Sequence, residues 1–360
     1  MTDDRIWRPD LLAVLDWEAV GRATERVYGK RQLATWWVQA TPGVNYYRAE
    51  MPAKHLPGRT VRLETRDVQF EGGEHYFPRQ RGAAIWMFPG NITRWLLMAE
   101  MKDDGRRVLV EVDDNYTTGP PISLSGWTVK QRDNPDASYE AHVKIVGSKA
   151  CDGVIVATPQ LGRVYERFGK PIYVCRNSVD VEDWPENPDH QPDGVLRIGW
   201  AGSASHQYDL ADIRPALDWA SRQKDVEIVV LGQLDPGVPH RNVPWTDKLS
   251  EYRVNVQQID IMLCPLRPSL WADCKSDVKA LEAAMGGACS VVSRTEPYRP
   301  WWDGEGPGYV AETRKDYVKV LKHLVANREE VRETATLARE YATTKRNIVN
   351  TIESWREAVA

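Results

Sequence analysis

The residues best suited to chemistry form one block in the second half of the chain. Lys275, Lys279 and Glu282 are spaced i, i+4 and i+7, so one face of a helix could present all three. Two cations on one face can bind a diphosphate, and a carboxylate one turn later can accept a pair of ribose hydroxyls. The same spacing also suits a solvated helix face with an i, i+3 ion pair, so spacing alone does not decide.

A turn of small residues at 201–205 lies between a predicted strand and a predicted helix. The backbone N–H groups of Gly202 and Ser203 could approach a phosphate there, and the N-terminus of the next helix favours an anion. His206 could donate to a phosphate oxygen, although a surface histidine is an equally simple interpretation. We add Arg267 and Ser276, which flank or belong to the cationic block, to this predicted donor site.

Two further groups of polar residues follow predicted strands in the first half. Asp113 and Asp114 could act as general base on an acceptor hydroxyl, orient it, or bind a hard cation; a helix N-cap or Asx-turn is the structural alternative. Gly43, Asn45 and Arg48 follow the first strand. They predict a loop that approaches an acceptor or a phosphate, and a tight turn with an exposed arginine is the alternative.

Composition describes an ordinary globular protein. At 360 residues the chain exceeds the usual size of one hydrophobic core, so we expect two domains. The net charge of −4 argues against a general nucleic-acid coat, and no run of about 18 apolar residues predicts a transmembrane helix. The N-terminus lacks the pattern of a secretory signal. We therefore expect a cytoplasmic protein.

Cysteine and tryptophan usage adds two observations. The five cysteines are odd in number and lack CxxC spacing, so we expect neither a disulfide framework nor a zinc site, and no metal is assigned. Fifteen Trp against four Phe is an unusual ratio. It fits either a high-GC coding sequence or aromatic platforms for sugars or bases, and most of these residues lie singly in apolar segments.

Strands and helices alternate through both halves, which predicts parallel sheets. A polar segment with three prolines at 181–194 predicts an interdomain linker. Ligands of such sheets bind beyond the carboxyl ends of the strands, so we expect the site in the cleft between the two halves. Strands are predicted at 33–38, 83–88, 108–112, 153–157, 172–174, 196–200, 226–231, 259–264 and 289–292, with strand edges at 61–63 and 68–70. Helices are predicted at 11–17, 92–101, 139–149, 161–168, 213–222, 278–285 and over the tail from 316 to 360, with a turn at 41–43 and a loop at 119–126.

These motifs, in this order, resemble a glycosyltransferase of the GT-B architecture. The similarity lies in Ile-Gly-Trp-Ala-Gly-Ser at 198–203, the strand at 259–266, the block at 275–286 and Asn-Ser-Val-Asp at 177–180. The second half resembles the large retaining nucleotide-sugar family (glycosyltransferase family 4-like), and the first half resembles its bacterial and bacteriophage members. The implied fold class is α/β, with two Rossmann-like doubly wound domains facing a cleft and a C-terminal helix crossing back to the N-terminal domain.

The resemblance implies an N-terminal acceptor-binding domain over 1–183 and a nucleotide-sugar domain over 195–340, with the helix 341–360 packing back. It implies transfer of a sugar from a UDP- or GDP-sugar to a hydroxyl, with retention and without a metal or cofactor. Glu282 would hold the donor ribose, while Lys275, Lys279 and the Gly202–Ser203 loop would hold the diphosphate. The family's first glutamate would fall at Cys274, so its role passes to Asp273 or Asp277, or is missing.

The acceptor and the reaction stay open at this stage. A hydroxymethylated base in phage DNA, a virion protein and a glycan are the acceptor classes that we consider. Arginines at 59, 62, 66, 79, 81 and 94, interleaved with aromatic residues, offer a weak DNA-binding signal that nearby acidic residues dilute. The alternatives are a non-catalytic nucleotide- or nucleic-acid-binding protein of the same fold and a nucleotide-sugar epimerase.

Overall fold

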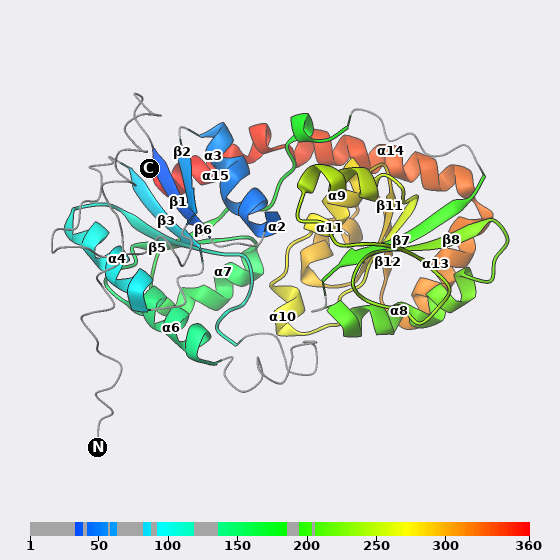
Figure 1. Cartoon of the computed structure of the whole chain (residues 1–360), viewed down its shortest axis with the longest axis horizontal. Coiled ribbons are helices and arrows are strands. Elements are labelled where there is room, and N and C mark those ends of the chain that lie inside the picture. The colour runs from blue at the N-terminus through cyan, green and yellow to red at the C-terminus, as the bar shows by residue number, and fades with distance from the viewer. Residues whose placement is uncertain are drawn as a thin grey trace, which may run out of the picture.

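The structure is a computed structural model that describes residues 33–38, 42–56, 58–62, 82–87, 92–118, 136–185, 194–203 and 206–360. Two parallel sheets dominate these residues, one in each half of an elongated molecule (Figure 1). The N-terminal sheet has the strand order β2-β1-β3-β4-β5-β6, and the C-terminal sheet has the order β12-β11-β10-β7-β8-β9. This is the predicted GT-B arrangement of two Rossmann-like units.

The strands of both sheets pair in parallel throughout. Those of the N-terminal sheet are β1 Ala34–Val38, β2 Gly58–Arg62, β3 Ala83–Met87, β4 Val108–Val112, β5 Gly153–Val156 and β6 Ile172–Val174. Those of the C-terminal sheet are β7 Leu196–Gly202, β8 Val226–Gly232, β9 Arg241–Val243, β10 Ile261–Cys264, β11 Cys289–Ser293 and β12 Tyr309–Ala311.

Helices cover both sheets and explain why the central strands are apolar on both faces. Every residue of β1, β3, β4, β5, β10 and β11 is buried, as expected for parallel strands between two helical layers. The helices of the first half are α2 Pro42–Asn45, η3 Tyr46–Glu50, α3 Met51–His55, α4 Ile92–Asp103, α6 Asp136–Gly147, α7 Pro159–Tyr165 and η4 Glu166–Phe168. Those that follow are η5 Val181–Asp183, α8 Gln207–Ala220, α9 Leu249–Val256, α10 Leu270–Asp273, α11 Val278–Met285, η7 Glu296–Tyr298 and α12 Arg299–Trp302.

The C-terminal tail forms three helices where the sequence predicted one helical stretch. They are α13 Arg314–Ala326, α14 Arg328–Lys345 and α15 Ile348–Val359. Asn327 separates the first two, and the Asn347 side chain caps α15 by accepting from the Val349 N–H. The helix α15 contacts α3 and β6, and its Trp355 ring lies 6.2 Å from that of Trp36 on β1. The predicted return of the C-terminal helix to the N-terminal half is therefore confirmed.

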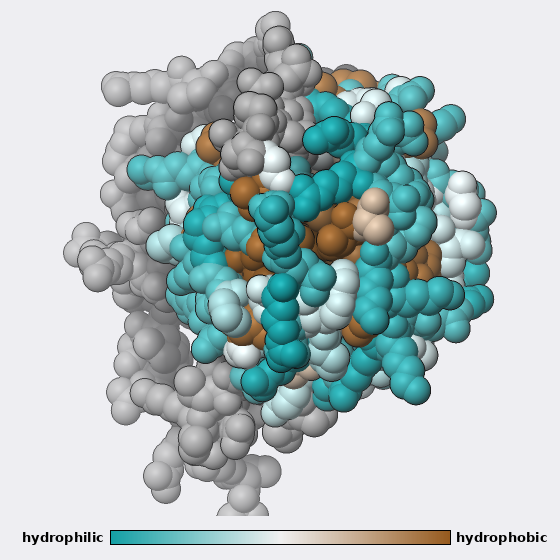
Figure 2. Space-filling view, turned by 90° about the vertical axis from the view of Figure 1, so that its right-hand side faces the viewer, coloured by the Kyte–Doolittle hydropathy of each residue, from teal (hydrophilic) through white to brown (hydrophobic). Residues whose placement is uncertain are grey.

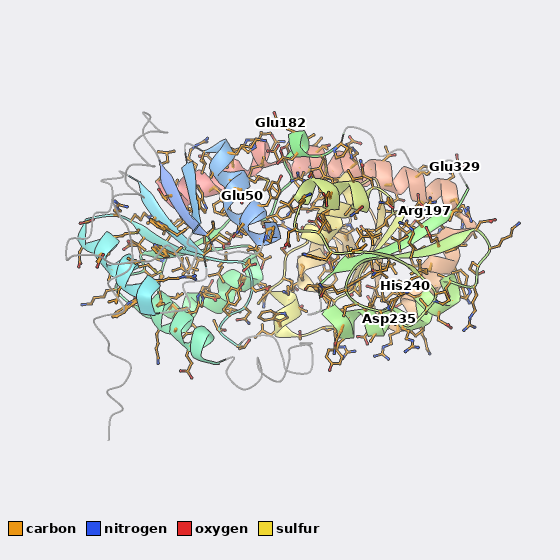
Figure 3. The ribbon with its side chains drawn as sticks, in the orientation of Figure 1. Glu50, Glu182, Arg197, Asp235, His240 and Glu329 are labelled. Carbon is orange, nitrogen blue, oxygen red and sulfur yellow. The ribbon has the colours of Figure 1, made fainter. Side chains whose placement is uncertain are left out.

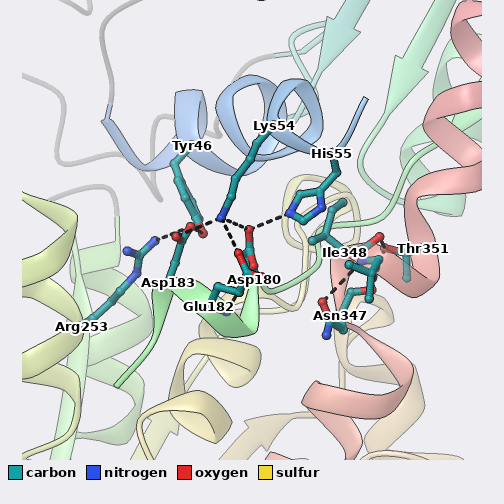
Figure 4. A network of polar contacts seen from close by, with 11 residues as sticks. Tyr46, Lys54, His55, Asp180, Glu182, Asp183, Arg253, Asn347, Ile348 and Thr351 are labelled. Atoms are coloured by element: carbon teal, nitrogen blue, oxygen red, sulfur yellow. Dashed lines mark hydrogen bonds and ion pairs between the residues drawn. The ribbon is translucent and has the colours of Figure 1, made fainter. Parts of the chain in front are cut away.

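The two halves are joined beside this helix by a dense polar junction. Val179 forms a parallel β-bridge with Asn347, and the buried Arg346 pairs with the buried Asp277. Asp180 accepts a 2.8 Å hydrogen bond from the Lys54 ammonium and lies 2.7 Å from the His55 Nε2 (Figure 4). Glu182 on η5, labelled in Figure 3, lies 3.3 Å from the same Lys54 ammonium.

Several predicted elements differ from the structure. The turn expected at 41–43 is wrong from Pro42 onward, because proline fits the first turn of a helix and α2 begins there. The predicted linker is helical at Val181–Asp183, and the Trp184 side chain that follows is buried in the core of the C-terminal half. The sequence predicted neither α9 nor β9. The predicted features at 11–17, 68–70 and 119–126, and residues 186–193 of the linker, lie outside the described residues.

The structure bears on the expectations about the cysteines and about membrane-spanning helices. All five cysteines are buried and free, which confirms that they form no disulfide framework. No helix within the described ranges is both long enough and apolar enough to cross a membrane. Figure 2 views the C-terminal half end-on, where hydrophilic residues cover most of the surface and apolar residues show only in separate areas.

Candidate functional site

A pocket in the cleft brings together most of the predicted site residues from both halves. Its cavity of about 370 Å³ falls within the usual size range of small-molecule sites. The pocket lies beyond the carboxyl ends of β1, β4 and β7, where parallel sheets bind ligands. The predicted residues that line it are Gly43, Arg48, Asp113, Asp114, Gly202, Ser203, His206, Lys275, Ser276, Lys279 and Glu282.

Lys279 is the most unusual charged residue of the pocket. Its Nζ is buried and has no hydrogen-bond partner in the described part of the chain. It lies 5.1 Å from the centre of the Trp200 ring, and burial lowers the pKa of its ammonium group. A buried cation without a hydrogen-bonding anion is costly, so this position is suited to an anionic ligand.

Glu282 lies one turn further along α11 and is held by tyrosines from both halves. Its Oε1 accepts a 2.9 Å hydrogen bond from the Tyr47 hydroxyl, and its Oε2 accepts a 2.8 Å bond from the Tyr252 hydroxyl. Burial raises the pKa of the Glu282 carboxyl, and the two tyrosine bonds oppose that shift. A carboxylate held this way can exchange a tyrosine for ligand hydroxyls without losing its own hydrogen bonds.

Lys275 reaches across the cleft to the acidic residues that follow β4. Its Nζ donates a 2.7 Å hydrogen bond to Asp114 and lies 4.7 Å from the centre of the Trp271 ring. Asp113 instead accepts a hydrogen bond from the Tyr116 hydroxyl. Burial is the main cause that raises the pKa of the Asp113 carboxyl, and the negative charge of the neighbouring Asp114 adds to it. The predicted acceptor side and the predicted donor side therefore touch through one ion pair.

Arg48 lies at the base of the pocket in the π-helical turn η3, a geometry that recurs at functional sites. Its Nε donates a 2.6 Å hydrogen bond to Glu111, and both side chains are buried. Its Nη1 donates to the Cys175 carbonyl and, over 2.9 Å, to the Asn177 side chain. Burial raises the pKa of Glu111 to about 7. Arg48 thus links the pocket wall to the segment that follows β6. It is buried, so the alternative interpretation of an exposed turn residue is wrong.

The end of β7 brings backbone close to the cation, as the small-residue turn predicted. A Cβ on Gly202 would lie 2.7 Å from the Trp200 ring and 3.4 Å from the Lys279 Nζ, so glycine is needed for this approach. The His206 Nδ1 lies 2.8 Å from Asp209, and burial lowers the pKa of the imidazole to about 4. His206 is therefore neutral at pH 7 and offers hydrogen bonding rather than charge.

Two predicted site residues do not reach this pocket. The Arg267 guanidinium donates 2.6 and 2.8 Å hydrogen bonds to Asp212 on α8 and does not line the pocket. Asn45 is fully buried at the end of α2 and does not line the pocket.

The position that corresponds to the first glutamate of the resembled family lies outside the pocket. Cys274 is buried against the hydrophobic core of the N-terminal half, so it does not face the pocket. Asp277 pairs with Arg346, and Asp273 lines a separate cavity, so neither of these carboxylates lines the cleft pocket. Within the described residues no group of three or more His, Cys, Asp or Glu is arranged to hold a metal ion.

Sequence reasoning missed the contribution of the segment around α9. Trp245, Thr246, Leu249 and Tyr252 all line the pocket. Leu249, Tyr252 and Val256 are spaced i, i+3 and i+7, which is a helical signal. The helix is short, however, and its other residues are polar apart from the exposed Val254. No spacing pattern predicts the hydrogen bond from Tyr47 to Glu282, because this contact depends on how the two halves approach each other.

Comparisons with known proteins support the fold. No protein-family model matches the sequence, and no curated protein is similar to it. Among solved structures, a glycosyltransferase from Rickettsia africae has a TM-score of 0.63 at 10% identity, covering 92% of this chain and 98% of its own. HepE of Anabaena, in complex with UDP and glucose, has a TM-score of 0.62 at 9% identity, covering 91% and 99%. Sucrose-phosphate synthase from Thermosynechococcus elongatus has a TM-score of 0.60 at 11% identity, covering 91% and 98%. At these identities the likeness shows the GT-B fold.

Proposed function

We propose that this protein is a glycosyltransferase that moves a sugar from a nucleotide-sugar donor to a hydroxyl acceptor. The observation that carries the proposal is the buried Lys279 ammonium, which faces the cleft without a hydrogen-bond partner among the described residues. A diphosphate supplies the missing anion, and Glu282 one turn away is placed to accept ribose hydroxyls. HepE, a structural neighbour, is described in complex with UDP-glucose, which agrees with a UDP-sugar as the donor.

The chemistry follows from the charges on each wall of the cleft. The bond between the anomeric carbon and the diphosphate oxygen breaks, and the acceptor oxygen bonds to that carbon. Lys279 stabilises the negative charge that develops on the leaving diphosphate, and Lys275 adds to it once it leaves Asp114. The acceptor hydroxyl gives up its proton to Asp113 or to the leaving diphosphate, and Asp113 has a pKa raised toward the range of a general base.

Retention of configuration, independence of a metal and a bacterial or phage setting are proposed on the family resemblance. The cytoplasmic location is proposed on the cysteine usage. The acceptor stays a prediction among a hydroxymethylated DNA base, a virion protein and a glycan. Most of the arginine cluster that favoured DNA lies at residues outside those whose side chains the structure describes.

The first test replaces the unpaired cation by an apolar side chain of similar length. Lys279→Met should weaken the binding of UDP or GDP by about 100-fold in titration calorimetry, because one buried cation–phosphate contact is lost. Without nucleotide the same variant should melt at a higher temperature than the wild type, because a buried charge without an anion is removed. Lys319→Met, on the exposed face of α13, is the matched control.

Two results would contradict the proposal. The first is that wild-type protein binds neither nucleotide. The second is that Lys279→Met and Lys319→Met bind nucleotide equally well. Once a nucleotide is identified, its sugar conjugates are tested for release of the free nucleoside diphosphate. Hydroxymethylated DNA, protein and glycan acceptors are supplied in separate reactions, and a labelled acceptor product separates transfer from hydrolysis or epimerisation.

A further inference from the structure

Trp245 differs from most tryptophans among the described residues, which are buried in the core. Trp36, Trp86, Trp200 and Trp355 are almost completely buried, whereas Trp245 is 49% exposed. Of the large hydrophobic side chains that are exposed within the described ranges, Trp245 alone lines the cleft pocket. An aromatic face left in water beside a ligand pocket is a surface that a planar ligand can cover.

The local structure holds this ring in one orientation. The Trp245 indole N–H donates a 3.0 Å hydrogen bond to Asp247, so the polar edge of the ring is satisfied by its own loop. Thr246 fixes the same loop, since its hydroxyl donates a 2.8 Å bond to Glu251 and accepts the Lys248 N–H. The ring face is therefore what this residue offers to the pocket.

The loop of Trp245 leads directly into the helix that contacts the predicted ribose site. Tyr252 lies on α9, four residues after the end of that loop at Lys248, and its hydroxyl bonds to Glu282. The next residue of α9, Arg253, lies 4.6 Å from the centre of the Tyr46 ring. Arg253 also lies beside Asp183, as Figure 4 shows. These contacts hold α9, and with it the end of the Trp245 loop, while the Tyr252 hydroxyl joins the same helix to Glu282.

We propose that the donor's nucleobase stacks on the ring of Trp245. This inference rests on the proposed function and extends it from the diphosphate and the ribose to the base. A donor base is favoured over an acceptor ring because Trp245, Lys279 and Glu282 belong to the same half of the molecule. Every base has a π-face, so stacking here contributes to the affinity of uracil and guanine nucleotides alike and does not select between them.

The test compares ligands with and without a base. Trp245→Ala should weaken the binding of UDP and of GDP by about ten-fold each in titration calorimetry, within the range measured for base–aromatic stacking. The binding of inorganic pyrophosphate should be unchanged, because it has no base. Trp245→Phe should keep most of the nucleotide affinity. Leu337→Ala removes an exposed apolar side chain that lies on α14, away from the pocket, and it should change neither nucleotide nor pyrophosphate binding.

The possible failures are separable. An unchanged nucleotide affinity in Trp245→Ala, while Lys279→Met abolishes binding, would overturn the stacking inference and leave the proposed function intact. An equal loss for pyrophosphate and nucleotide would also overturn it, because the ring would then act through the shape of the site. A change in the acceptor KM alone would assign the ring to the acceptor. Wild-type protein that binds neither nucleotide nor pyrophosphate would instead contradict the proposed function.

Discussion

The two halves of the chain meet in two regions of opposite electrostatic character. At the junction beside α14 and α15 the charged groups are paired, with Arg346 and Arg176 on Asp277 and Lys54 on Asp180. In the cleft, Lys279 is buried and has no hydrogen-bond partner among the described residues. The charges of the junction are therefore balanced without a ligand, whereas the buried cation of the cleft lacks an anion. Changes at the junction should therefore act on stability, and changes in the cleft should act on binding.

The largest effect is expected from breaking the junction at Arg346. Arg346→Met leaves the buried Asp277 with only the more distant Arg176, 3.2 Å away, and should lower the free energy of unfolding by about 3 kcal/mol. Denaturation in guanidinium chloride measures this loss. Arg356→Met, which breaks an exposed i, i+3 pair with Glu353 on α15, should cost less than about 0.5 kcal/mol.

A second variant guards against simple loss of packing at this position. Adding Asp277→Asn to Arg346→Met removes the charge that was left buried, so the double variant should regain part of the lost stability. If the double variant is no more stable than Arg346→Met, the junction is not held by its charges, and the contrast with the cleft disappears.

A comparable effect is expected from pH, through the buried ion pair between Arg48 and Glu111. Burial raises the pKa of Glu111 to about 7, above its unfolded value near 4.5. Between these values the folded state binds the proton and the unfolded state does not. Stability should therefore fall as pH rises from about 4.5 to about 7, by up to about 1.4 kcal/mol per pH unit.

Other groups that titrate in this pH range have the opposite effect on stability. The measurement therefore compares the unfolding free energy of the wild type with that of a Glu111 variant. Burial lowers the pKa of His206 to about 4 and of His142 to about 3, and both groups make stability rise with pH up to their unfolded values. Subtracting the unfolding profile of Glu111→Gln from that of the wild type removes these terms. A flat difference profile would show that Glu111 is ionised normally in the folded protein.

The contrast between junction and cleft also shows what the sequence can predict. The strands and the cationic helix were predictable because they depend on local patterns: apolar runs bounded by turn residues, and Lys279 and Glu282 at helical spacing. The expectation that Lys275 shares this helix was wrong, because it lies in the bend before α11. The Gly286–Gly287 stop of α11 was predictable for the same reason, since Gly287 has a φ of +81° that favours glycine.

The partners of these residues were not predictable, because they come from distant parts of the chain. Tyr47 and Tyr252 meet on Glu282 across 235 and 30 residues of sequence, and no spacing pattern carries that contact. The partner of Arg267 was hidden for a related reason, because Asp212 lies 55 residues away on α8.

The smallest effect is expected where the cleft is already paired, at Lys275 and Asp114. These side chains are about one-fifth exposed, so their ion pair contributes little to stability, but it holds Lys275 away from a diphosphate. Asp114→Asn should therefore raise the affinity for UDP by about three-fold at low salt, and the gain should shrink as salt screens the freed cation. Asp218→Asn, in the exposed pair with Arg222 on α8, is the matched control and should leave UDP binding unchanged. If Asp114→Asn binds UDP more weakly than the wild type, Asp114 orients Lys275 for the ligand instead of competing with it, and the ion pair then belongs to the donor site as a positioning contact.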